Sequence, residues 1–230
     1  MQTALIIPAL NEEPVIGQML DAIPGLLYKM IVVADNGSTD RTAEIAAAHG
    51  ATVVHEVERG YGAACLRAME ALPPDVQAVV FMQADLSEYP EEARLLLEPI
   101  ESGRADMVVG TRTKGTAAAG SLLPHQEFGN WIATSLIRVL YGFRYSDLGP
   151  FRAIRREALE RLQMQERNYG WTIEMQVRAI EERLKVIEVP VRYRNRAAGV
   201  NKVSGNAKAS FMAGYKIVLT VIRLWLRRRR

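Results

Sequence analysis

Three short apolar segments in the first part of the chain are each followed by a loop rich in acidic and amide side chains. The apolar segments cover residues 4–8, 30–33 and 79–82, and the polar loops behind them include Asn11, Asp35 and Gln83. In a parallel open sheet, ligands bind outside the carboxyl ends of the strands. We therefore expect the three loops to converge on one crevice.

The spacing of apolar residues predicts alternating strands and helices in the first half. The expected strands cover residues 4–7, 30–33, 52–55 and 76–82, and the expected helices cover residues 15–23, 42–49 and 62–71. The third helix should stop before Pro73 and Pro74, because proline disrupts a helix interior. Such a series of strand–helix–strand units predicts a parallel sheet.

The second half mixes helices and strands less regularly. We expect helices at residues 90–102, 130–141, 156–164 and 172–183, and strands at residues 107–110 and 185–193. Pro190 favours an edge position or a bulge for the last strand. Residues 114–120 and 196–208 are candidate mobile loops over the site.

Composition indicates one ordinary folded domain. The chain has 230 residues, of which 49% are hydrophobic and 24% are charged, and this length is enough to bury a substantial core. The single cysteine, Cys65, excludes an internal disulfide and a cysteine-rich metal site, and it is compatible with a reducing cytoplasm. Cys65 lies in a small apolar stretch, so we expect burial rather than a nucleophilic role.

Charge and the first residues bear on partners and location. The net charge is only +3, so we do not expect nucleic-acid binding. The chain enters a strand almost at once, without the charged and long apolar regions of a secretory signal. We therefore expect a cytoplasmic protein.

The order of the loops resembles the family 2 glycosyltransferases of the GT-A fold. That family reads P-x-x-N-E, D-D-G-S-x-D-x-T and D-x-D, and residues 8–12, 35–42 and 83–85 stand in the corresponding places. In the second half, residues 147–152 (DLGPFR), 170–175 (GWTIEM) and 189–194 (VPVRYR) resemble segments of polyprenyl-phosphate sugar transferases and their bacterial relatives. The resemblance implies an α/β fold with a mostly parallel central sheet flanked by helices.

The resemblance also implies an enzyme that moves a hexose from a nucleoside diphosphate sugar to an acceptor, with inversion. Polyprenyl phosphate is the leading acceptor, and a soluble or saccharide hydroxyl is the alternative. A second class stays open, in which Gln83 marks a nucleotide-sugar-binding protein with little turnover. An oligomer is compatible with the sequence.

Residues of the first two loops would hold the nucleoside. The resemblance implies that it is framed by Pro8, Ala9, Asn11, Glu12 and Asp35. Asp35 ends a strand and could accept the N3 proton of a base or ribose hydroxyl protons.

Two further features near these loops have structural alternatives. Asp40 precedes an expected helix and is a candidate cap. In the Arg59-Gly60-Tyr61-Gly62 segment, the two glycines, Gly60 and Gly62, would let the backbone approach the nucleotide, although a turn that needs glycine accounts for them equally well.

Asp85 is the candidate ligand for a Mg²⁺ or Mn²⁺ ion that bridges the donor phosphates, because these cations prefer oxygen ligands and accept phosphates in their shell. Gln83 stands where the family carries the first carboxylate. Its neutral amide oxygen should lower metal affinity unless Glu88 swings in. The alternative for Glu88 is a surface residue at the start of the next helix.

Positive side chains near strand ends and loops are candidates for binding the diphosphate: Arg112, Arg152, Arg194, Arg196 and Lys202. Residues 196–202 resemble the R-x-x-G-x-S-K loop of polyprenyl-phosphate transferases, with Asn201 in place of the serine. Arginine suits a phosphate through bidentate hydrogen bonds. Each of these side chains could instead be a solvated surface residue.

Asp147 is the first candidate for a catalytic base. An acceptor hydroxyl needs a base within hydrogen-bond reach, whereas a lipid phosphate is already ionised, and Asp147 would then orient the sugar or the loop. Glu174 either takes part in catalysis or pairs with Arg178 one helical turn away. His125 lies in a loop that could face the acceptor.

The C-terminal segment predicts an amphipathic basic helix over residues 211–230, after a catalytic domain over residues 1–210. Lys216 and Arg223 interrupt its apolar run, which is too short and too charged for a comfortable membrane span. Trp225 and the four terminal arginines suit an anchor on anionic lipid, which would hold the protein on the inner membrane surface. The alternatives are a helix packed on the catalytic domain and a dimer contact.

Overall fold

The structure is a computed structural model that describes residues 1–197 and 207–228. Its strands form one sheet in the order β3-β2-β1-β4-β6-β5-β7. The strands are β1 (Thr3–Ala9), β2 (Met30–Asp35), β3 (Thr52–His55), β4 (Ala78–Phe81), β5 (Met107–Thr111), β6 (Arg152–Arg155) and β7 (Val186–Pro190). The helices are α1 (Ile16–Asp21), α2 (Thr42–Ala48), α3 (Tyr61–Glu70), α4 (Ala93–Glu101) behind a 3-10 turn (Pro90–Glu92), α5 (Pro124–Tyr141), α6 (Arg156–Leu162), α7 (Trp171–Glu181) and α8 (Ala207–Arg228).

The predicted parallel sheet is confirmed for the first four strands. β6 was not predicted, and it runs antiparallel to both β4 and β5. Its four residues, RAIR, are too few and too mixed to carry a strand pattern. α5 begins at Pro124 rather than at residue 130, because proline is well tolerated at the first helical position.

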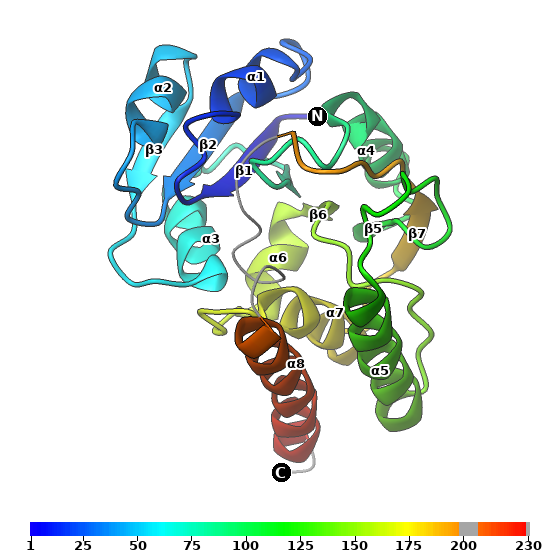
Figure 1. Cartoon of the computed structure of the whole chain (residues 1–230). Coiled ribbons are helices and arrows are strands. Elements are labelled where there is room, and N and C mark those ends of the chain that lie inside the picture. The colour runs from blue at the N-terminus through cyan, green and yellow to red at the C-terminus, as the bar shows by residue number, and fades with distance from the viewer. Residues whose placement is uncertain (198–206, 229–230) are drawn as a thin grey trace.

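Helices cover both faces of the sheet, so its strands are apolar on both sides (Figure 1). In β1, Leu5 and Ile7 pack in the cluster that contains residues of α1 and α4. Ala4 and Ile6 point to the opposite face and pack with residues of α3, α6 and α7. This alternation follows from the two-residue period of a strand.

A third apolar cluster joins α5, α7 and α8 beyond the sheet. Ile137, Val177, Val221 and Leu224 are buried in it, and α5 and α8 extend away from the sheet in Figure 1. The alternative of a C-terminal helix packed on the rest of the protein is therefore confirmed for the side of α8 that carries Val221 and Leu224. Among the helices of residues 1–197 and 207–228, none has the length and hydropathy needed to cross a bilayer.

Candidate functional site

A cavity of about 540 Å³ opens where the loops behind β1, β2 and β4 meet. Leu10, Asn36 and Asp85 line it from these three loops, so the expected convergence of the loops is confirmed. The opposite wall comes from the start of α5, from the loop before α7 and from residues of α8. Parallel strands place their carboxyl ends at one edge of the sheet, which explains why distant loops meet here.

The cavity separates the predicted site residues into two groups. Those that line it are Pro8, Ala9, Glu12, Gln83, Asp85, Arg112 and Arg196. Those that do not line it are Asn11, Asp35, Gly62, Asp147 and Arg152. Lys202 lies outside the described residues.

Asn11 ties the first loop to the second instead of facing the cavity. Its backbone has a φ of 49°, in the left-handed region that asparagine tolerates. Its side-chain oxygen accepts the backbone N–H of Thr39 at 2.8 Å, and its own N–H donates to Ser38 Oγ at 2.9 Å. Asp40 accepts the backbone N–H of Thr42, the first residue of α2, although Arg41 rather than Asp40 occupies the N-cap position.

Asn36, rather than Asp35, presents the second loop to the cavity. Asp35 is buried, where it accepts the N–H of Ser38 and lies 3.2 Å from the ring of His55. The amide of Asn36 donates to the carbonyls of Glu56 and Glu58 and accepts the N–H of Gly60. Sequence reasoning missed Asn36, although side chains that alternate past a strand end would have favoured it over its neighbour.

The two glycines at the start of α3, Gly60 at its N-cap and Gly62 in its first turn, are explained by close backbone packing. A Cβ on Gly60 or Gly62 would lie 2.0 Å from the carbonyl oxygen of Arg167 or Glu166, respectively. Gly62 does not face the cavity. The need for glycine at this turn therefore has a structural origin within the protein.

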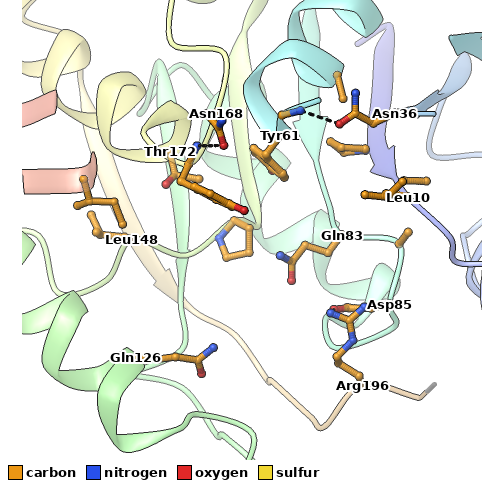
Figure 2. Close-up of a pocket in the computed structure, with 18 of the residues that line it drawn as sticks. Leu10, Asn36, Tyr61, Gln83, Asp85, Gln126, Leu148, Asn168, Thr172 and Arg196 are labelled. Carbon is orange, nitrogen blue, oxygen red and sulfur yellow. Dashed lines mark hydrogen bonds and ion pairs between the residues drawn. The ribbon is translucent and has the colours of Figure 1, made fainter. Parts of the chain in front are cut away.

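The third loop presents one carboxylate oxygen to the cavity. Asp85 Oδ1 accepts the N–H and the hydroxyl of Ser87 at 2.9 and 2.6 Å. Asp85 Oδ2 lies 3.2 Å from Arg196 Nη1, and Arg196 Nη2 lies 2.9 Å from Glu12 Oε1. Figure 2 shows Asp85 and Arg196 against each other, with Gln83 extending from the same loop. The loop thus offers oxygen ligands for a cation, but the guanidinium of Arg196 already contacts Asp85 Oδ2.

Glu88 is not the surface residue that one sequence interpretation proposed. It is 2% exposed, and its Oε2 accepts the backbone N–H of Gln83 at 2.8 Å. Burial raises the pKa of Glu88 to about 8, and the nearby Asp85 carboxylate adds to the rise. Glu88 does not line the cavity, so here it braces the loop from behind.

Arg112 and Asp147 form a buried pair at the end of β5. Asp147 accepts the backbone N–H and Nε of Arg112 on one oxygen and Nη2 on the other. The Arg112 guanidinium lines the cavity and packs over the ring of Tyr193. Burial lowers the pKa of Arg112, but the Asp147 carboxylate outweighs burial and raises it above the ordinary value. Asp147 therefore supports a cavity cation.

Arg152 is buried behind the cavity and does not reach it. It is 1% exposed and donates to the carbonyls of Leu148, Gly149 and Thr172. Burial also lowers its pKa. A phosphate contact by Arg152 has no support in this arrangement, and the side chain instead holds the segment after Asp147 against the start of α7.

Other candidates have structural partners. Glu174 pairs with Arg178 at 2.8 Å, as one interpretation proposed, and also accepts the N–H groups of Gln165 and Glu166. Arg194 donates to the carbonyl of Leu86 and does not line the cavity. Cys65 is buried, as expected.

The wall of the cavity opposite the third loop also contains residues that the sequence did not indicate. His125 lines it as predicted, and Gln126, Asn168 and Tyr169 join it from the same wall. Figure 2 shows Gln126 on α5, across the cavity from the third loop. Nothing in their local sequence marks these residues, because α5 and the loop before α7 are brought here by tertiary packing.

In the described part of the chain, the charged side chains of Asp, Glu, Lys and Arg that line the cavity are two carboxylates and three arginines. They are Glu12, Asp85, Arg59, Arg112 and Arg196. Within residues 1–197 and 207–228, no group of three His, Cys, Asp or Glu side chains could hold a metal ion by itself. A cation here would take further ligands from a substrate. The arrangement suits a polyanionic ligand that brings its own oxygens.

Comparison with known proteins agrees with this chemistry. The family model "Glycosyl transferase family 2" matches residues 4–163. An uncharacterized glycosyltransferase of Mycobacterium tuberculosis is 36% identical over 91% of this chain and 93% of its own length. Polyprenol monophosphomannose synthase of Mycolicibacterium smegmatis is 31% identical over 89% of this chain and 82% of its own length.

A solved structure shares the fold. Glucosyl-3-phosphoglycerate synthase from Mycobacterium tuberculosis, in complex with Mn²⁺, UDP-glucose and phosphoglyceric acid, has a TM-score of 0.79 and is 24% identical. The alignment covers 97% of this chain and 79% of that one. This likeness confirms the expected GT-A fold.

Proposed function

The chain belongs to glycosyl transferase family 2, and on this premise we propose that it transfers a hexose from a nucleoside diphosphate sugar to polyprenyl phosphate, with inversion. One observation carries the proposal: carboxylates and arginines meet in one cavity at the strand ends, where a diphosphate would find both a cation site and fixed positive charge. A relative with 31% identity is named polyprenol monophosphomannose synthase, which favours this acceptor.

The donor nucleoside occupies the part of the cavity formed by the first two loops. Pro8 and Ala9 offer backbone and apolar surface there, and Asn36 holds residues 56–60 against the same region. Tyr61 adds an aromatic wall (Figure 2). In this arrangement Asp35 and Asn11 act indirectly, because they shape the loops from outside the cavity.

Asp85 and Gln83 would hold a Mg²⁺ or Mn²⁺ ion. The residues fit such a hard cation, since Asp85 and Gln83 both line the cavity and carry oxygen ligands, and two such residues leave coordination positions for phosphate and water oxygens. When bound, the ion neutralises charge that develops on the leaving diphosphate. The structure of glucosyl-3-phosphoglycerate synthase contains Mn²⁺, and this supports a divalent cation in the present protein as well.

Arg112 positions the acceptor phosphate. Asp147 fixes the guanidinium through both oxygens, so the charge is preorganised before the acceptor arrives. An ionised phosphate oxygen attacks the anomeric carbon, and the electron pair of the broken bond leaves with the diphosphate. This reaction needs no proton acceptor, which agrees with an Asp147 that is occupied by Arg112.

A surface on α5 and α8 would bring the protein to lipid. We define the α5–α8 surface by Phe128, Trp131, Ile222 and Leu226, which are exposed although apolar. Phe128 and Trp131 stack with their ring centroids 5.9 Å apart, and the cavity residues Gly129 and Asn130 lie between them in the sequence.

The charge of α8 fits the same partner. Arg223, Arg227 and Arg228 are exposed on α8, and basic side chains next to apolar ones are typical of contact with anionic lipid. Peripheral association at the cytoplasmic membrane surface follows as part of the proposal. The division into a catalytic domain over residues 1–210 and a basic C-terminal segment over residues 211–230 is also proposed, although α8 begins at Ala207, four residues before the proposed boundary.

Product formation tests the function directly. Purified protein should convert a radiolabelled nucleoside diphosphate hexose and a short-chain polyprenyl phosphate into a charged glycolipid that partitions into organic solvent. Arg112→Gln should reduce this product, while Arg192→Gln, an exposed variant outside the cavity, should not. Labelled product with a saccharide acceptor and none with polyprenyl phosphate would show that the acceptor is a saccharide and would reject polyprenyl phosphate.

A second function is favoured by Gln83, because Asp85 is then the one carboxylate of the third loop that lines the cavity. A protein of this kind would bind nucleotide sugar with little turnover. Donor binding by calorimetry, without product from either acceptor class, would favour it over transfer.

A further inference from the structure

The guanidinium of Arg196 lies between two buried carboxylates of the cavity. Its Nη2 is 2.9 Å from Glu12 Oε1, and its Nη1 is 3.2 Å from Asp85 Oδ2. The side chains of Glu12 and Asp85 are only 7% and 6% exposed. Two carboxylates this poorly solvated need a nearby positive charge, and Arg196 supplies it from the protein itself.

Backbone pairing holds Arg196 in this position. The N–H of Ala197 donates to the carbonyl of Asp85 at 3.1 Å, and the N–H of Arg194 donates to the carbonyl of Ser87 at 2.9 Å. The segment therefore lies directly along the third loop. The guanidinium contacts Asp85 because the chain on either side of it is fixed to the same loop.

Asp85 has one oxygen that a cation can take from the cavity. Ser87 engages Oδ1 with two hydrogen bonds, and Oδ2 is the atom that contacts Arg196. Gln83, which precedes Asp85 by two residues, contributes no charge. A divalent ion and the guanidinium would thus share one carboxylate oxygen, and their mutual repulsion would be unfavourable in a poorly solvated place.

We propose that Arg196 is a built-in cation that competes with the divalent metal for Asp85, so that the metal binds tightly only together with a nucleoside diphosphate. The diphosphate adds negative charge, which lets both cations stay in the cavity and gives the guanidinium a phosphate to contact. This inference rests on the proposed function in one respect, the assignment of Asp85 as the metal ligand. According to the inference, Arg196 is the reason why tight metal binding depends on the nucleoside diphosphate.

Mn²⁺ titration followed by electron paramagnetic resonance of the free ion tests the competition without any turnover. Wild type, Arg196→Gln and Arg192→Gln are titrated alone and with uridine or guanosine diphosphate. Arg192 is the matched control, because it lies in the same segment but pairs with Glu91 and Glu92 outside the cavity.

Without nucleotide, Arg196→Gln should bind Mn²⁺ about tenfold more tightly than wild type, because one positive charge is removed from beside two carboxylates. Arg192→Gln should match wild type. Added nucleoside diphosphate should tighten Mn²⁺ binding in wild type much more than in Arg196→Gln. Equal Mn²⁺ affinity of wild type and Arg196→Gln without nucleotide would overturn the inference.

The outcomes separate the inference from the proposed function. Tighter Mn²⁺ binding by Arg196→Gln in a protein that makes no glycolipid would support the competition and reject the transfer. Glycolipid formation by wild type, together with an Mn²⁺ affinity that Arg196→Gln leaves unchanged, would support the transfer and reject the competition. If Arg196→Gln does not fold, wild type can still contradict the inference, because equal Mn²⁺ affinity with and without a bound nucleoside diphosphate would exclude the competition.

Discussion

The carboxylate of Asp147 holds the guanidinium of Arg112 through both of its oxygens, with Nε 2.9 Å from Oδ2 and Nη2 2.8 Å from Oδ1. Asp147 is fully buried, whereas Arg112 reaches the cavity. In the proposed transfer, Asp147, the residue that the sequence offered as a base, acts through its partner Arg112. A base role would require this pair to separate, and transfer to a phosphate does not require it.

Asp147→Asn should destabilise the fold by about 3 kcal/mol, because it leaves the poorly exposed Arg112 without its counter-charge. Urea unfolding measures this loss. Glu160→Gln removes one partner of a pair in which the carboxylate is 59% exposed, and it should change stability by less than about 1 kcal/mol. Similar losses for the two variants would show that the buried pair contributes little.

Glu88 should contribute a component of stability that falls as the pH rises from about 4.5 to about 8. Burial raises the pKa of Glu88 to about 8 in the folded state, so the folded protein binds this proton more tightly than the unfolded chain and unfolding releases it. Glu88→Gln should lose this component, making the variant more stable relative to wild type at pH 8 than at pH 5, by up to about 4 kcal/mol. Parallel pH profiles of the two proteins would contradict the assignment.

Asn36→Ala should weaken binding of nucleoside diphosphate more than Asp35→Ala does. The first change removes the side chain that holds residues 56–60 beside the cavity, whereas the second acts behind the loop. We expect a loss of about tenfold in affinity for Asn36→Ala, equivalent to roughly one lost hydrogen-bond contribution. Isothermal titration calorimetry gives both values, and a larger loss for Asp35→Ala would restore Asp35 as the nucleoside contact.

Gln83→Asp should tighten Mn²⁺ binding in the presence of nucleoside diphosphate, because it returns a charged oxygen to the third loop. Asp85→Asn should abolish the metal-dependent part of turnover. Glycolipid formation is compared with Mn²⁺ and with excess chelator. Equal rates under the two conditions would mean that Arg112 and Arg196 neutralise the diphosphate without a metal.

Trp131→Ser combined with Phe128→Ser should reduce co-sedimentation with anionic vesicles while leaving nucleotide binding intact. Arg227→Gln with Arg228→Gln should reduce mainly the salt-sensitive part of the binding, by about 1 kcal/mol for each arginine. These changes avoid Leu224, which is buried between helices and whose removal would open the core. Wild type that stays in the supernatant at low salt would eliminate the α5–α8 surface as a lipid contact.

Local pattern was enough for most elements and for the place of the site. β1, β2 and β4 were predicted because buried parallel strands are continuous apolar runs. β6 was not predicted, because its four residues of mixed polarity do not form such an apolar run. Glu88 was misjudged for a similar reason, since a glutamate near a helix start looks solvated unless its burial is known.

The sequence alone determined the alternation of strands and helices and the convergence of three polar loops, because both follow from short-range periodicity and from the shared edge of parallel strands. Only the tertiary structure decided which charged groups meet there. Arg112 and Asp147 are 35 residues apart, and Arg196 and Glu12 are 184 residues apart. The preferences of a charged side chain at one position do not specify its partner, since the partner depends on how the completed sheet and helices bring distant loops together.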